Sequence, residues 1–236
     1  MLSEKRSNAI IKSHCYFGSI CCFLAGVVFT TISVFALFLP ASIASYQATD
    51  QYFFDFLDHK ETFILLKILL FIANLTMISV VSAFASLVRE KNSGIVLWAS
   101  SLAIIGYGFG MYQSILDITV IPKLVDAFVN HGPLIKETIK IFGFSNPAVY
   151  IVSMGLPGLW FIIVSLLAFD NDLIPKGLIF LGFLWGLGSI LTAVAHTVVN
   201  LPLIYLVAVG AIIFAPIWSF WEGLFLLKIA RKIEKK

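Results

Sequence analysis

The fold class is decided by stretches such as residues 63–88, FILLKILLFIANLTMISVVSAFASLV, a mostly apolar run of 26 residues with one charged side chain, Lys67. A helix needs about 20 apolar residues to cross a hydrocarbon core of roughly 30 Å, so this run can span a membrane with some tilt. Arg89, Glu90 and Lys91 follow it directly and mark the return to water.

Six windows of this kind lie along the 236-residue chain. Runs such as 161–167, FIIVSLL, are apolar at every position but Ser165, which argues against the alternating strands of a membrane barrel. The sequence therefore predicts an all-α polytopic membrane protein, one domain over residues 1–236 with six transmembrane helices. Their predicted bounds are about 16–39, 63–88, 95–116, 149–169, 178–199 and 203–227.

The composition excludes an ordinary soluble domain, because 60% of the residues are hydrophobic and 12% are charged, whereas soluble domains carry about 25% charged residues. The net charge of +3 follows the membrane topology and predicts no nucleic-acid partner. Membrane lipids are the expected partners, and a second copy or another membrane protein remains an open alternative.

The positive charges fall on one side of the predicted membrane. With six spans both termini share a side, and the tails and even-numbered loops on that side hold eleven Lys and Arg residues. The opposite loops hold four, namely Lys60, Lys123, Lys136 and Lys140. Positive residues favour cytoplasmic loops, so we expect cytoplasmic N- and C-termini in the cell membrane.

Two loops on the other side are long enough to have structure. Residues 46–62 mix acidic and aromatic side chains, and we expect the aromatics to lie at headgroup level. A metal site at Asp55, Asp58 and His59 is an alternative there. Residues 117–148 predict two short amphipathic helices in the third loop, starting near Pro122 and Pro133. They would lie in the interface or cap the bundle, with a lid over a cavity as the alternative.

Polar residues inside spans are the candidate functional residues, because a charge near the bilayer centre costs about 2.5–3.5 kcal/mol. Glu222 should face the bundle, with a polar partner or a water molecule within hydrogen-bond reach. Pro216 frees a backbone carbonyl oxygen, which could accept a hydrogen bond from protonated Glu222 or from a water that both share. Lys67, Gln113, Asp117 and His196 fall at similar depth, with Asn74 on the same helix face as Lys67. We favour a structural role, in which these groups satisfy one another or reach water, and the alternative is a ligand or proton site.

Small residues predict close helix contacts, and prolines predict irregular helices. Glycines at helical spacing favour close approach, as at Gly18, Gly106, Gly110, Gly182 and Gly186. The stretch 155–158, GLPG, and Pro216 should weaken or kink their helices.

No enzyme or cofactor motif is present: the chain has no His-Glu-x-x-His, no Gly-x-Ser-x-Gly and no phosphate-binding loop. Gly106 to Gly110 lies inside a span, where a dinucleotide loop does not occur. The cysteines, Cys15, Cys21 and Cys22, all lie at the first span and predict no disulfide framework. We therefore expect no catalytic residues, no cofactor and no bound metal.

The last two spans resemble a widespread bacterial family of uncharacterised six-helix integral membrane proteins, a domain of unknown function. The resemblance rests on residues 173–177, LIPKG, and on Pro216 followed by residues 222–228, EGLFLLK. It implies a bacterial cytoplasmic-membrane protein with a recurrent acid at Glu222, but no reaction.

The sequence leaves three functions open. The leading hypothesis is a non-enzymatic bundle with a role in binding, assembly or membrane adaptation. The first alternative is a small-solute or ion transporter or channel, and the second is an intramembrane enzyme. A water-filled path through the helices would favour transport, and a dry bundle would favour the leading hypothesis.

Overall fold

The computed structural model describes residues 2–45, 48–88, 92–142, 149, 151–198 and 201–234, and these are almost entirely helical. Six helices are long and apolar enough to cross a membrane, so the predicted all-α polytopic fold is confirmed. The helices are α1 (Leu2–Phe38), α2 (Ala41–Ser45), α3 (Asp50–Val88), α4 (Ser93–Thr119), α5 (Ile121–Asn130), α6 (Pro133–Phe142), η1 (Ile151–Gly155), α8 (Leu156–Ala168), α9 (Lys176–Thr197) and α10 (Leu201–Glu234).

Some of the sequence predictions concern residues that the structure does not describe. The charges of Arg89, Lys91, Lys235 and Lys236 lie outside the described part of the chain, as do residues 143–148 of the third loop.

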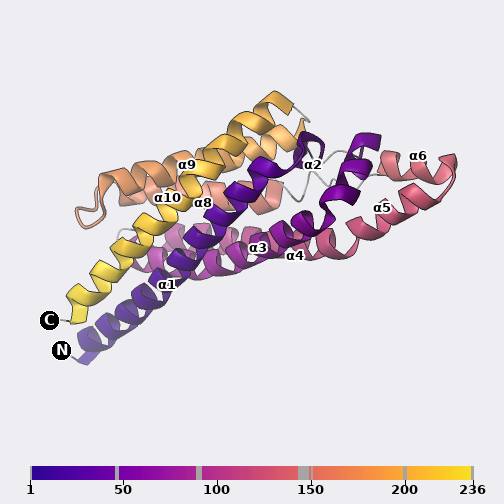
Figure 1. Cartoon of the computed structure of the whole chain (residues 1–236). Coiled ribbons are helices and arrows are strands. Elements are labelled where there is room, and N and C mark those ends of the chain that lie inside the picture. The colour runs from indigo at the N-terminus through magenta and orange to yellow at the C-terminus, as the bar shows by residue number, and fades with distance from the viewer. Residues whose placement is uncertain are drawn as a thin grey trace.

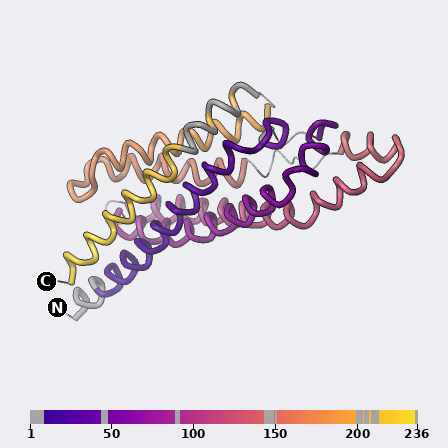
Figure 2. The backbone as a smooth tube through the Cα atoms, in the orientation of Figure 1, coloured from indigo at the N-terminus to yellow at the C-terminus, as the bar shows by residue number. Residues whose placement is uncertain are grey.

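The six spans form a closed ring. Each span packs against the next along the chain, in the order α1, α3, α4, α8, α9 and α10, and α10 packs back against α1. Figure 1 shows both chain termini at the same end of this ring, and Figure 2 shows α1 and α10 side by side there. We call this the terminal end, and the opposite end the distal end.

Small residues allow the close contacts in the ring, as predicted. A methyl group added at Gly18 would lie 2.3 Å from Ala83 Cβ, and one at Gly186 would lie 2.7 Å from the Gly158 carbonyl oxygen. At the terminal end, Lys12 Nζ and Tyr16 Oη of α1 donate to the Glu234 carboxylate of α10 at 2.8 and 2.9 Å. The first and last helices are therefore joined by both packing and charge.

Helix α3 is too long to lie wholly within a membrane. Its 39 residues rise about 58 Å, and fitting them into a hydrocarbon core of roughly 30 Å would need a tilt near 60°, beyond the observed range of 0–40°. The charged residues Asp58, Lys60 and Glu61 precede the apolar run, and the helix is kinked at His59. The Asp50 end therefore extends out of the membrane on the distal side.

This extension belongs to a distal cap, which we define as α2, residues 50–62 of α3, α5 and α6. Figure 1 shows α5 and α6 projecting beyond the rest of the bundle. The cap has its own apolar core, in which the Phe53 and Phe128 rings stack at 4.0 Å. The prediction that the aromatics of residues 46–62 lie at headgroup level is wrong for Tyr52, Phe53 and Phe56, which are buried in this core. They pack inward because α5 covers them.

The two short helices of the third loop form where the prolines predict. Pro122 lies in the first turn of α5, and α6 begins at Pro133. Of the apolar stripe expected on α6, Ile139 is buried, whereas Leu134 and Phe142 are each 81% exposed. Helix α6 therefore packs against the rest of the cap through a small part of its surface.

The predicted irregular helix is found in the fourth span. Residues Ile151–Gly155 form a π-helical turn that leads into α8, with Pro157 in the first turn of α8. In the sixth span, α10 is assigned as one helix through Pro216.

Candidate functional site

A cavity of about 280 Å³ lies inside the ring, lined by residues of α1, α3, α4, η1, α8, α9 and α10. Most of its wall is apolar, and none of the described lining residues is charged. None of them belongs to α5 or α6 either, so the described residues give no support to a lid made by these helices. The polar residues of the wall are Ser33, Asn74, Tyr107, Ser153, Ser189 and Thr192.

The wall hydroxyls are positioned to accept hydrogen bonds. Ser33, Ser189 and Thr192 each donate to a carbonyl oxygen one turn earlier in their own helix, at 2.8 to 2.9 Å. A hydroxyl that has donated its proton still has oxygen lone pairs. The cavity therefore suits a molecule that is mostly apolar and carries an O–H or N–H donor.

Aromatic rings close the cavity toward the terminal end. We call Phe84, Trp160, Phe161, Trp185 and Trp218 the aromatic floor. Phe161 and Trp185 belong to the cavity wall, and their ring centroids are 4.4 Å apart. Trp218 packs edge-on against Phe161 at 4.9 Å. This cavity therefore lies in the distal half of the bundle.

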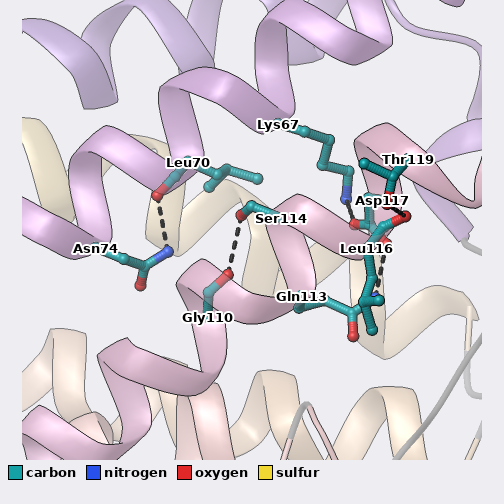
Figure 3. A network of polar contacts seen from close by, with 9 residues as sticks. All are labelled: Lys67, Leu70, Asn74, Gly110, Gln113, Ser114, Leu116, Asp117 and Thr119. Carbon is teal, nitrogen blue, oxygen red and sulfur yellow. Dashed lines mark hydrogen bonds and ion pairs between the residues drawn. The ribbon is translucent and has the colours of Figure 1, made fainter.

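A buried ion pair lies distal to the cavity. Lys67 Nζ of α3 is 2.7 Å from Asp117 Oδ2 of α4, with side chains 10% and 2% exposed. Gln113 Nε2 donates to the other carboxylate oxygen at 2.6 Å, so Asp117 is held from two sides, as Figure 3 shows. Leu70, one turn from Lys67, lies in the cavity wall. The ion pair therefore joins α3 to α4 just outside the cavity.

The structure brings Lys67, Gln113 and Asp117 into direct contact, and His196 lies near enough to Lys67 for electrostatic interaction. Asn74 lies farther into the bundle, where its Nδ2 donates to the Leu70 carbonyl oxygen at 2.8 Å and its amide packs against Gly110. His196 is half-buried, with Nδ1 2.9 Å from the Thr192 carbonyl oxygen of its own helix. Asn74 and Thr192 both line the cavity.

Glu222 lies apart from this cluster, between α10 and α1. It is fully buried, so it faces the bundle as the sequence predicts. Neither carboxylate oxygen has a hydrogen-bond partner among the described residues, and the expected polar partner is not seen there. The Pro216 explanation was wrong, because the carbonyl freed by Pro216 lies ten residues before Glu222, about 15 Å along the axis.

The sequence reasoning did not identify Ser219 or the cavity. Ser219 is fully buried three residues before Glu222, and its hydroxyl has no partner among the described residues. The i, i+3 spacing of these two polar residues was the available signal. The sequence does not show which hydroxyls line the cavity, because a serine that donates to its own helix can lie at any position in a span.

The alternative metal site in the cap is not formed. The Asp55 carboxylate accepts hydrogen bonds from Ser42 and from Gln51 Nε2, and His59 Nδ1 contacts the Asp55 carbonyl oxygen. Among the described residues no three His, Cys, Asp or Glu side chains are grouped as metal ligands. Larger depressions of about 430 and 420 Å³ lie near Asp172 and Lys232, and they share no lining residue with the cavity inside the ring.

Comparison with known proteins and protein families shows the family of the chain. No curated protein and no solved structure matches the chain. The family model described as "Domain of unknown function (DUF4386)" matches residues 21–229, which include all six spans in whole or in part. The chain is therefore a multi-pass membrane protein that belongs to the DUF4386 family.

Proposed function

We propose that this protein binds a small, mostly apolar molecule with a hydrogen-bond donor in the cavity between its six spans. The cavity carries the proposal: its volume of about 280 Å³ is close to the lower limit of small-molecule sites, roughly 300 Å³. Its wall combines apolar side chains with a few acceptor oxygens. The lack of charge among the described wall residues favours a neutral ligand, since an ion there would be desolvated without a counter-charge.

The test uses para-bromobenzyl alcohol as the probe, in protein reconstituted into lipid nanodiscs. Bromine quenches tryptophan fluorescence at short range, and Trp185 lies in the wall. We expect a saturable quenching component that is absent in Trp185→Phe. Quenching of the lipid-exposed Trp98 by alcohol dissolved in the bilayer should rise without saturation.

A matched pair of variants on α3 tests whether the probe binds in the cavity. Ala73 lies in the cavity wall, so Ala73→Phe should fill the space and abolish the saturable component. Leu75 is 51% exposed on the outside of the same helix, and Leu75→Phe should leave that component unchanged. Equal saturable quenching in Ala73→Phe and the parent would contradict binding in the cavity.

Transport of such a molecule is the second candidate, favoured by the π-helical turn. Ser153 of η1 and Pro157 of α8 both line the cavity, and π turns and broken helices occur at functional sites. The aromatic floor supports binding over transport in this conformation. Labelling of Ser153→Cys from both sides of a sealed vesicle would favour transport, and labelling from one side alone would favour binding.

We also propose that the terminal end of the bundle is cytoplasmic and that the protein resides in the cell membrane, with lipids as its partners. The eleven-to-four distribution of Lys and Arg supports this orientation. An impermeant thiol reagent added to intact cells should label Thr138→Cys on the exposed face of α6 and leave a C-terminal cysteine unmodified. The reverse pattern would overturn the orientation.

A further inference from the structure

Two buried polar residues on α10 remain unexplained by the cavity. Glu222 and Ser219 are both fully buried, and all three of their side-chain oxygens have no hydrogen-bond partner among the described residues. Spaced three residues apart, they are neighbours on one helix face. Buried polar groups are nearly always satisfied, so three adjacent oxygens without a partner indicate a bound species.

The surroundings of these oxygens are close-packed and lack a counter-charge. From α1, Cys15 lies near enough for electrostatic interaction with Glu222, and Cys22 lies beside the next residue, Gly223. Ser19 of α1 uses its hydroxyl elsewhere, donating to the Gly223 carbonyl oxygen at 2.8 Å. Toward α9, the neighbouring residues Trp218 and Trp221 pack against Gly182 and Gly177. No cationic side chain of the described residues pairs with Glu222.

Charge balance selects the kind of ligand. One carboxylate in a dry helix interface carries one negative charge, and leaving it unbalanced is costly. A divalent ion would leave a net positive charge in its place. Carboxylate and hydroxyl oxygens are hard ligands, which suit protons and alkali cations better than soft metals. We propose that Glu222 and Ser219 form a binding site for a monovalent cation, either H⁺ or Na⁺.

The site is separate from the proposed ligand cavity. Ala215 lies in the cavity wall, and the site residues Ser219 and Glu222 follow one and two turns later, about 6 and 10 Å along the same helix face. Trp218, part of the aromatic floor, occupies the turn between them. The proposal therefore stands whether or not the cavity binds a molecule.

Infrared difference spectroscopy tests the proposal, because it distinguishes a protonated carboxylic acid from a carboxylate without requiring a reagent to reach the site. The spectrum of Glu222→Gln is subtracted from that of the parent in nanodiscs. Without alkali cations at neutral pH, we expect the carbonyl band of a protonated acid. The matched control is Glu234→Gln, which removes a solvent-exposed acid from the same helix and should retain the Glu222 band.

Titration with NaCl at constant pH then identifies the cation. Conversion of the acid band to a carboxylate band by NaCl, and not by choline chloride, assigns Na⁺. In that case Ser219→Ala should raise the NaCl concentration for half-conversion by about tenfold, through loss of one ligand. If raising the pH converts the acid band to the carboxylate band reversibly, and Na⁺ has no effect, the bound cation is H⁺.

Two results would overturn the proposal. A carboxylate band at neutral pH without alkali cations would mean that another group of the protein balances the charge. An acid band that neither pH nor Na⁺ changes would mean a permanently locked side chain, which binds and releases nothing. Folding of each variant is checked first by its elution from size exclusion and by its helical circular dichroism.

Discussion

The amide of Asn74 in α3 occupies the space where a side chain would begin at Gly110 of α4. A Cβ atom at position 110 would lie 2.6 Å from Asn74 Oδ1 and 2.9 Å from Nδ2. Glycine at position 110 thus leaves room for the Asn74 amide between α3 and α4.

Replacement of two glycines in α4 should therefore have opposite effects. Gly110→Ala forces Asn74 to move and should cost about 1–3 kcal/mol of unfolding free energy. At Gly108 an added methyl group meets nothing within 4 Å, so Gly108→Ala should stabilise the helix by about 0.5–1 kcal/mol. SDS-induced unfolding in bicelles measures both, and equal effects of the two substitutions would contradict the contact.

Removal of one member of the Lys67–Asp117 pair should be more damaging than removal of both. Asp117→Asn removes the negative charge that lies 2.7 Å from the buried Lys67 ammonium, and we expect a loss of about 3–5 kcal/mol. Lys67→Met combined with Asp117→Leu should recover most of that loss. Lys12→Met, which breaks the more exposed pair with Glu234, is the control and should change unfolding little. A double variant no more stable than Asp117→Asn would show that the pair itself stabilises the fold.

Replacement of Glu222 by leucine should not destabilise the protein. The sequence led us to expect a polar partner whose loss would cost stability, but the described residues supply none. Leucine has a similar size and needs no partner or bound ion, so Glu222→Leu should melt at the same temperature as the parent or higher. A clearly lower melting temperature in nanodiscs would indicate that a protein group does hold the carboxylate.

The cap should loosen at high pH through Lys140. Its ammonium bonds Asp50 of α3 at 2.8 Å and Glu137 at 2.9 Å. These hydrogen bonds, first to Asp50 and then to Glu137, raise the pKa of Lys140 above its ordinary value of 10.5. A raised pKa stabilises the folded cap fully below pH 10.5, and that contribution is lost as pH rises through the higher folded value.

Spin labels at Gln51→Cys and Thr138→Cys would measure the loosening of the cap. The distribution of distances between the labels should broaden as the pH rises through the raised pKa of Lys140. In Lys140→Met the distribution should already be broad at neutral pH. Salt should weaken the effect because the pair is exposed. A distribution that stays unchanged in Lys140→Met would contradict a role for the pair in holding α6.

Much of the fold was predictable because membrane spans depend on local sequence. The apolar windows, Pro122 and Pro133 in first turns, and the irregular start of the fourth span each follow from rules that act over a few residues. Helices α1 and α3 begin at Leu2 and Asp50, before the predicted spans, because charged residues such as Lys12 and Asp58 end an apolar run without ending a helix. A helix continues into water whenever its residues have partners there.

The candidate site was predictable only where charges were involved. Lys67, Gln113 and Asp117 could be placed together because a buried charge needs a partner at the same depth. His196 and Asn74 were harder, since each can bond a carbonyl of its own helix. The cavity depends on how helices that are distant in the sequence pack together. Its volume therefore cannot be predicted from a local sequence pattern.

Because the cap has a separate apolar core, different forces stabilise the two regions of this molecule, one surrounded by water and the other by lipid. Around Phe53 and Phe128 the hydrophobic effect operates as in a soluble protein, since water is displaced when the rings pack. Among the spans lipid is as apolar as the side chains, and close packing and polar contacts stabilise the ring instead. Urea, which solvates exposed apolar groups in water, should therefore unfold the cap while the spans stay assembled. Helix α3 is part of both regions, with residues 50–62 in the cap and the apolar run from Phe63 among the spans.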